Sequence, residues 1–418
     1  MSSNDPFATY ITHWRDFLHR CLPAGRTESI SIPGTGEAEF NRLALELFGL
    51  QFHHNAVYRH FCAARGATPT TATRWAAIPA VPASAFKEFD LTSLPPGRRT
   101  AVFHSSGTTG HRPGCHYHDA ESLRVYAESL APWFRVHLLP EADAKAAAGF
   151  EAPGASPEPA GSSGPGQHPR GRMVILSPAP VQAPHSSLVY MFETVRRIFA
   201  DGESVYAGRL DMDGGWSLDV AGVTKALQQA MDGQTPVLLM GTAFCFVHLL
   251  DHLLGQGQSY ALPGGSRVLE TGGYKGRSRS LPKAELHGLI GRHLGVAPAN
   301  IICEYGMCEL SSQAYDWAAG VPGTASKVAG IGSGVAQGGR VFQFPPWARA
   351  VVVSPEDGRE VADGETGLLR VWDLANVRSV MAVQTEDLAL RRGAGFEWVG
   401  RAAQSAPRGC SLMPAAPR

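Results

Sequence analysis

The sequence lacks three features that would assign it to a broad class of protein. It has no uninterrupted run of about 18 apolar residues, the length that crosses a membrane. Its first residues lack the basic start and apolar stretch of a signal peptide. Basic and acidic side chains balance at 37 each, which leaves no positive excess for a nucleic-acid backbone. We therefore expect a cytoplasmic protein with no membrane span and no nucleic-acid partner, while a single nucleotide remains open as a ligand.

Cysteine is also sparse, and its pattern argues against a disulfide framework. The seven cysteines are odd in number and scattered, as expected where thiols stay reduced (residues 21, 62, 115, 245, 303, 308 and 410). Three possible metal ligands do fall within Cys115-His116-Tyr117-His118. A zinc site usually needs a Cys-x2-Cys or helically spaced pair together with a second ligand pair, so this spacing argues against a metal site.

The pattern of apolar residues predicts an α/β protein. Residues 1–66 form an N-terminal helical segment, in which Trp14, Phe17 and Leu18 share one face. From residue 67 onward, short apolar runs alternate with helical stretches, which indicates a largely parallel sheet covered by helices. The expected strands lie at 173–176, 236–240, 267–270 and 300–303, and the expected helices at 187–200, 243–254 and 283–294. After about residue 345, turn signals at 356–358 and 393–395 predict a β-rich subdomain.

One internal segment departs from this pattern. From about residue 141 to 171 the chain consists mainly of Ala, Gly, Pro and Ser. Such a composition has too little apolar bulk to offset the entropy of ordering. We predict a disordered surface insertion there.

A loop that follows Phe103 and His104 is the most informative stretch of the sequence. It combines hydroxyl side chains with glycines, so that backbone N–H groups and hydroxyls can surround an anion. Its candidate ligand-binding residues are Ser105, Ser106, Gly107, Thr108, Thr109 and Gly110. The same composition is typical of a solvated turn. It is not a Walker A loop, because His111 follows Gly110 where that motif has lysine.

Four motifs, in order, resemble those of the adenylate-forming (ANL) superfamily. Ser105-Ser-Gly-Thr-Thr-Gly110 resembles its phosphate loop, and Glu304-Tyr-Gly-Met-Cys-Glu309 its Tyr-Gly-x-Thr-Glu motif. Thr385-Glu-Asp387 and Gly400-Arg401 resemble its Thr-Gly-Asp and hinge motifs. Within that superfamily the chain resembles the acyl-protein synthetase (LuxE-type) family, through the segments 78–87, 186–191, 271–276, 304–315 and 408–412.

The resemblance implies a fold and an activity. The fold is the large α/β domain of an adenylate-forming enzyme, at 67–399, with a β-rich C-terminal subdomain. Because the chain ends at Arg418, the resemblance implies a short hinge and acceptor segment at 400–418 instead of most of the mobile C-terminal domain. The implied reaction uses ATP and Mg²⁺ to activate a carboxylic acid, a fatty acid in this family, as an acyl-adenylate. A cysteine thiol then takes the acyl group for delivery to a partner acyl reductase or other acyl-acceptor protein.

The resemblance also implies a role for each motif residue. Glu309 would hold Mg²⁺, since a carboxylate suits that ion. Around the nucleotide, Tyr305 and Gly306 would contact adenine, Asp387 the ribose hydroxyls, Arg401 the ribose or phosphate, and Gly272 and Gly273 would let the backbone approach closely. Cys410 would accept the acyl group. Each residue type also occurs in ordinary core, turn or surface positions, and only the order of the motifs selects these.

Two departures from the superfamily leave alternatives open. Cys308 stands where threonine is usual, and a thiol is a weak hydrogen-bond partner. The lysine that commonly follows the phosphate loop is absent, which leaves Lys87 and Arg112 as candidates for its charge. The alternatives are a ligase that uses an external acceptor such as CoA, a carrier protein or an amine, and an inactive nucleotide-binding partner subunit. An apolar helix around Phe244 and Phe246 fits an acyl pocket or plain core.

Overall fold

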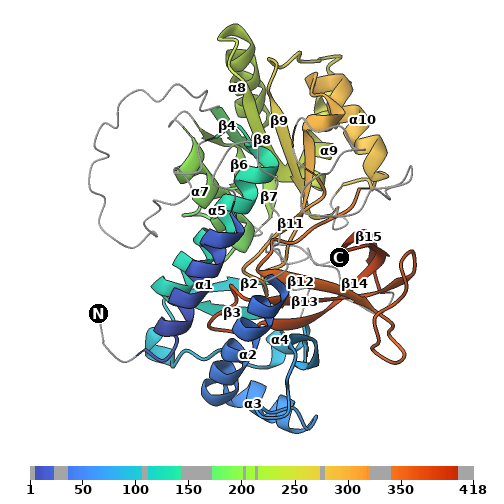
Figure 1. Ribbon diagram of the computed structural model, residues 1–418. Coiled ribbons are helices and arrows are strands. Elements are labelled where there is room, and N and C mark those ends of the chain that lie inside the picture. The colour runs from blue at the N-terminus through green and yellow to red at the C-terminus, as the bar shows by residue number, and fades with distance from the viewer. Residues whose placement is uncertain are drawn as a thin grey trace.

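The computed structural model describes residues 5–22, 36–105, 112–142, 172–200, 204–211, 215–273, 278–317, 319 and 340–402 (Figure 1). The helices are α1 Ala8–Cys21, α2 Gly36–His54, α3 Ala56–Ala63, α4 Ala85–Glu88, α5 Ala120–Leu138, α7 Ser187–Phe199, α8 Val220–Asp232, α9 Ala243–Gly255 and α10 Lys283–Leu294. The strands of the α/β part are β2 Ala101–His104, β3 Cys115–His118, β4 Arg172–Ile175, β5 Val205–Tyr206, β6 Gly208–Leu210, β7 Trp216–Leu218, β8 Val237–Thr242, β9 Arg267–Thr271, β10 Ile301–Tyr305 and β11 Ala314–Tyr315. Those of the second sheet are β1 Val81–Pro82, β12 Ala348–Val353, β13 Thr366–Asp373, β14 Ala382–Arg392 and β15 Gly395–Arg401.

A central sheet with the strand order β11-β10-β9-β8-β4-β5 confirms the predicted α/β architecture. Its strands are parallel except for β11, which pairs with β10 in the antiparallel sense. Both faces are covered, so the strands are continuous buried runs, as is usual for parallel sheets. Leu238 and Met240 belong to a core that includes residues of α5 and α7, whereas Val237 and Leu239 belong to a core with α8, α9 and α10.

The C-terminal strands form the predicted β-rich part. The second sheet has the order β1-β14-β13-β12, and β15 pairs with β14. A tight turn at Gly393 and Ala394 joins β14 to β15, as the sequence predicted. Gly393 has a φ of +57°, in the left-handed region that glycine enters without a steric penalty.

Helices α1 to α3 lie within the segment predicted to be helical, and they pack into the core of the second sheet. Tyr10 donates a hydrogen bond to the carbonyl oxygen of Leu374 (2.8 Å), and Gln51 Nε2 donates to that of Asn376 (2.8 Å). Helix α1 also lies along α5 in Figure 1. The N-terminal helices therefore share one hydrophobic core with the second sheet.

Helix α5 and the β2–β3 hairpin frame the predicted phosphate loop. Asp119 caps α5 and accepts a hydrogen bond from the Ser122 backbone N–H (2.8 Å). In the hairpin, His116 Nδ1 donates to the carbonyl oxygen of Cys308 (2.7 Å), and burial lowers the pKa of His116 to about 4. This histidine is therefore a neutral link between the hairpin and the segment after β10.

Three expectations fall partly or wholly outside the described residues. The loop residues 106–111 between β2 and β3 lie outside them, as does Cys410. The predicted insertion lies outside them from residue 143 onward. Glu141, at the start of the insertion, is described and forms an ion pair with Arg267 (2.8 Å). No helix in the described part of the chain is long and apolar enough to cross a bilayer.

Candidate active site

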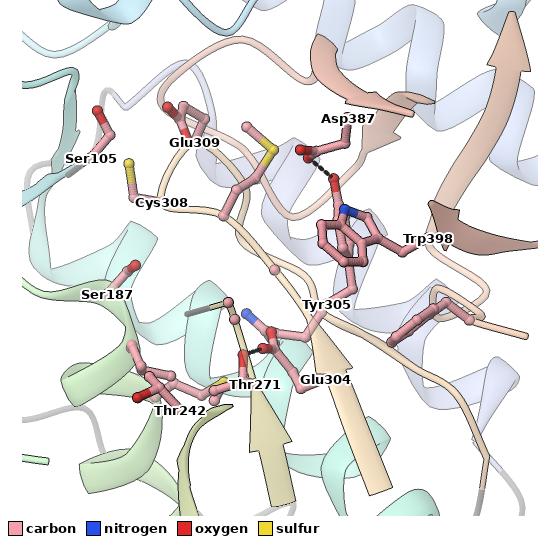
Figure 2. A pocket seen from close by; sticks show the side chains of 18 of the residues that line it. Ser105, Ser187, Thr242, Thr271, Glu304, Tyr305, Cys308, Glu309, Asp387 and Trp398 are labelled. Carbon is pink, nitrogen blue, oxygen red and sulfur yellow. Dashed lines mark hydrogen bonds between the residues drawn. The ribbon is translucent and has the colours of Figure 1, made fainter. Parts of the chain in front are cut away.

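A cavity of about 290 Å³ opens where β8, β9 and β10 end, opposite β14 and β15 of the second sheet (Figure 2). Thr242 and Thr271 are the last residues of β8 and β9, and Tyr305 is the last of β10. Helices α5 and α7 close one side with Tyr126, Leu188 and Met191. Carboxyl ends of parallel strands are the usual place for ligands in α/β proteins.

The cavity brings together predicted residues from segments far apart in the chain: Ser105, Gly272, Gly273, Tyr305, Gly306, Glu309, Asp387 and Arg401. Lys87, on α4, and Arg112 are not among its described lining residues. Arg112 is exposed, and its Nη2 lies 3.9 Å from Asp90 Oδ1. Ser106, Gly107, Thr108, Thr109, Gly110 and Cys410 lie outside the described residues, so their predicted roles stay predictions.

Asp387 and Tyr305 are joined by a hydrogen bond at the β14 side of the cavity. The Tyr305 hydroxyl donates to Asp387 Oδ2 (2.6 Å), as Figure 2 shows. Arg401 Nε lies 3.6 Å from Asp387 Oδ1, and the same guanidinium group forms an ion pair with Glu386. The Tyr305 ring meets the Phe396 ring edge-on, with the centroids 5.3 Å apart. A rigid aromatic ring beside a buried carboxylate suits a ring-bearing ligand with vicinal hydroxyls, such as a nucleoside.

Glu309 offers a carboxylate to the cavity. It is 4% exposed, and its backbone oxygen accepts a hydrogen bond from Asn376 Nδ2 (2.9 Å), which fixes its position. Its side chain has no hydrogen bond or ion pair with any residue that the structure describes. A buried carboxylate is costly without a counter-charge, so this residue fits a hard cation such as Mg²⁺.

Two glycines at the edges of the cavity have different surroundings. Gly272 has a φ of +68°, and a Cβ built there would meet no atom within 4 Å. A Cβ at Gly306 would instead collide with Glu304 Oε1. The first glycine therefore allows a left-handed turn beside a ligand, and the second makes room for a carboxyl group of the protein itself.

A row of polar side chains that the sequence analysis missed lies across the cavity floor. Thr242 pairs with Thr271, and Thr271 with Glu304, so the three side chains stand side by side on one face of the sheet. The Thr271 hydroxyl donates to Glu304 Oε2 (Figure 2). Burial, together with the nearby Glu270 charge, raises the pKa of Glu304 to about 7. The only signal in the sequence is that Thr271 and Glu304 directly precede Gly272 and Tyr305.

Glu270, on the opposite face of the same strands, belongs to a second cluster with Lys283, which also lines the cavity. Glu270 Oε2 lies 3.2 Å from Lys283 Nζ and 3.4 Å from His287 Nε2, and it accepts from Cys303 Sγ (2.9 Å). Burial opposes its ionisation, but the charge of Lys283 and the His287 contact lower the pKa of Glu270 to about 2. Ligand atoms of Glu270, His287 and Cys303 lie within 4.8 Å of one another, yet the Lys283 ammonium group already neutralises this cluster.

No protein-family model and no curated protein matches the sequence. Solved structures do match the fold. An open conformation of 2-hydroxyisobutyryl-CoA ligase, in complex with 2-HIB-AMP and CoA, is similar over 91% of this chain and 74% of that chain, with 14% identity and a TM-score of 0.57. The same ligase in its postadenylation state, in complex with R3-HIB-AMP, is 12% identical with a TM-score of 0.58, over 91% of this chain and 72% of that one. The fold is therefore that of adenylate-forming enzymes, as the motifs predicted, while membership of the LuxE-type family stays a prediction.

Proposed function

We propose that the protein is an adenylate-forming ligase, which joins a carboxylic acid to ATP as an acyl-adenylate and releases pyrophosphate. The observation that carries this proposal is the convergence of Glu309, Asp387 and Tyr305 on one cavity. These residues come from two motifs that are distant in sequence, and each is of a type that the chemistry requires. The similar ligase structures are complexes with an acyl-AMP, which supports the same chemistry here.

The role of each residue follows from its chemistry. Asp387 accepts hydrogen bonds from ribose hydroxyls, and Tyr305 lies against the adenine ring. Glu309 would hold Mg²⁺, which supplies positive charge at the phosphate oxygens while the acid attacks the α-phosphorus. The loop from Ser105 to Gly110 would bind the phosphates, and Lys87 or Arg112 remains the proposed source of further positive charge.

ATP–pyrophosphate exchange tests this proposal. Glu309→Gln removes the ionic oxygen but keeps the shape, and we expect exchange to fall about a hundredfold or more. Glu285→Gln, an identical substitution at an exposed position of α10, is the matched control and should leave exchange unchanged. Exchange by Glu309→Gln within about threefold of wild type would overturn the site assignment.

For the acyl group's next step, the narrower proposal is transfer to Cys410. The thiolate attacks the carbonyl carbon of the adenylate, a C–S bond forms, the C–O bond to phosphate breaks, and AMP leaves. The thioester then passes the acyl group to a partner acyl reductase. Incubation with ATP, Mg²⁺ and acid should give a hydroxylamine-sensitive label that Cys410→Ser abolishes while exchange persists. Label retained by that variant would overturn transfer to Cys410.

A ligase that uses an external thiol is the second candidate. It is favoured by the similar structure that contains both an acyl-AMP and CoA. Release of AMP that depends on added CoA, with no labelled protein, would select it. Binding of ATP without exchange for any acid would instead select an inactive nucleotide-binding subunit. The LuxE-type resemblance implies a fatty acid substrate.

A further inference from the structure

The side chains on the cavity floor bear on which acid the proposed reaction uses. Thr242, Thr271 and Glu304 form the polar row on the face toward α5 and α7. Beside this row, Gln313 Nε2 donates to the Tyr126 hydroxyl (3.0 Å). The apolar lining from α7 is confined to Leu188 and Met191 among the described residues. Met307, Phe342 and Trp398 supply further apolar surface, so this row is the part of the lining that can hydrogen-bond to a polar group of the acid.

Glu304 has one carboxyl oxygen left for a ligand. Oε2 accepts from Thr271, while no residue in the described ranges donates a hydrogen bond to Oε1. Oε1 lies toward Gly306, where any side chain would occupy the same space. The residue is 6% exposed and lines the cavity, so water reaches it only through that cavity. Oε1 is therefore an acceptor at the cavity wall, and a donor on a ligand can form a hydrogen bond with it.

The size of the cavity limits the acid further. Its volume of about 290 Å³ is at the small end for sites that hold drug-sized ligands. The same cavity includes Tyr305 and Asp387, which the proposed function assigns to the nucleoside. The acyl group would therefore share this volume with the nucleoside.

These observations rest on the proposed function and deepen it. We propose that the acid is short and carries a hydrogen-bond donor, a hydroxyl or an ammonium group, that binds the Glu304 carboxyl group. An ammonium group would pair with the ionised carboxylate, whereas a hydroxyl can bind either protonation state. Glu304 is thus a specificity-determining residue: it selects the acid and takes no part in bond making.

Exchange with matched acids tests the inference. Each set shares a carbon skeleton: propionate, lactate and alanine; butyrate, 3-hydroxybutyrate and 3-aminobutyrate; phenylacetate, mandelate and phenylglycine. Dodecanoate and hexadecanoate complete the panel. We expect a hydroxy or amino acid to exceed its unsubstituted parent in kcat/KM by about a hundredfold or more, because a site built for a donor rejects analogues that lack it. The hydroxy and amino members distinguish the two donors.

The outcomes distinguish failure of this inference from failure of the proposed function. Preference for dodecanoate, hexadecanoate or an unsubstituted parent would overturn the inference and leave adenylation intact. Exchange with no acid in the panel, by protein that binds ATP, would overturn the proposed function itself.

A variant series checks that Glu304 is the selecting group. Glu304→Ala should lower the preference for the donor-bearing acid over its parent by at least about tenfold. Glu304→Gln keeps an acceptor oxygen without charge, so it should retain preference for a hydroxy acid and lose preference for an amino acid. ATP affinity close to that of wild type shows that each variant is folded. An equal fall of kcat/KM for both acids would indicate a merely structural role and overturn the assignment.

Discussion

Glu270 and Glu304 lie on adjacent strands, both buried, yet they have opposite environments. Glu270 is 0% exposed and contacts Lys283 and His287 on the α10 side of the sheet. Glu304 faces the cavity, and its hydrogen bond within the described chain comes from the Thr271 hydroxyl. The pKa of Glu270 falls to about 2, whereas that of Glu304 rises to about 7.

The difference shows what separates a structural carboxyl group from one available to a ligand. Burial alone disfavours the charged form of both residues. A protein cation reverses that effect at Glu270, because Lys283 Nζ lies 3.2 Å from its carboxylate. No such ion pair is present at Glu304 among the described residues. Burial therefore does not distinguish a carboxyl group that is available to a ligand from a structural one, whereas the kind of partner does.

The largest effect on stability should come from removing the Lys283 cation beside Glu270. Lys283→Met leaves the Glu270 carboxylate buried beside His287 and the Cys303 thiol, without its lysine counter-charge, and we expect the free energy of unfolding to fall by about 3 kcal/mol, the low end for an unpaired buried charge. Urea denaturation at pH 7 measures it. The double variant with Glu270→Gln should recover part of the loss, since no charge then remains to compensate. A single-variant loss below about 1 kcal/mol would mean that the two glutamates differ less than the ion pair indicates.

A pH-dependent effect should follow at Glu304. Its pKa is raised from 4.5 in the unfolded chain to about 7, so the folded state binds more protons between these values. The contribution of this group to stability is therefore highest at low pH and falls as pH rises to about 7. Glu304→Gln removes this dependence and should stabilise the protein by about 3 kcal/mol more at pH 8 than at pH 4. Urea midpoints at both pH values measure it, and an equal change at both would contradict the altered pKa.

The smallest effect should come from the hydroxyl that bonds to Glu304. Thr271→Val removes a donor that favours the charged carboxylate, so the pKa of Glu304 should rise further, and about 1 kcal/mol of stability is lost at pH 8. Thr242→Val is the matched control in the same row, because the Thr242 hydroxyl donates to Cys245 Sγ (3.1 Å) instead. Equal pH profiles for the two variants would show that the Thr271 hydroxyl does not affect Glu304.

The sequence predicted the elements whose pattern is local. Helix α10 was expected at 283–294 and lies there, because apolar residues recur on one face and Gly295 ends it with a φ of +68°. Helix α5 was missed because it is buried nearly all round, including Arg135 and His137, and contains Pro132. The sequence of this helix therefore shows neither the period of an amphipathic helix nor a composition free of helix-breaking residues.

The residues of the site likewise divide into those that the sequence indicates and those that only the fold reveals. Tyr305, Glu309 and Asp387 could be named from the sequence because they stand in motifs that resemble those of the adenylate-forming superfamily, and all three line the cavity. Glu304 could not, since its meaning depends on strand register, which sets it beside Thr271 from another strand. Lys87 and Arg112 were inferred only from their charge and from their position in the sequence before and after the loop. Neither property shows where a side chain points.

The Glu304 carboxyl group also couples binding to the solvent proton concentration. Near pH 7 it is about half protonated, so an acid whose ammonium group binds there should expel about half a proton into the buffer. The heat of binding measured by calorimetry would then change between buffers of different ionisation enthalpy. A hydroxy acid that accepts or donates one hydrogen bond without changing the charge would give the same heat in each buffer.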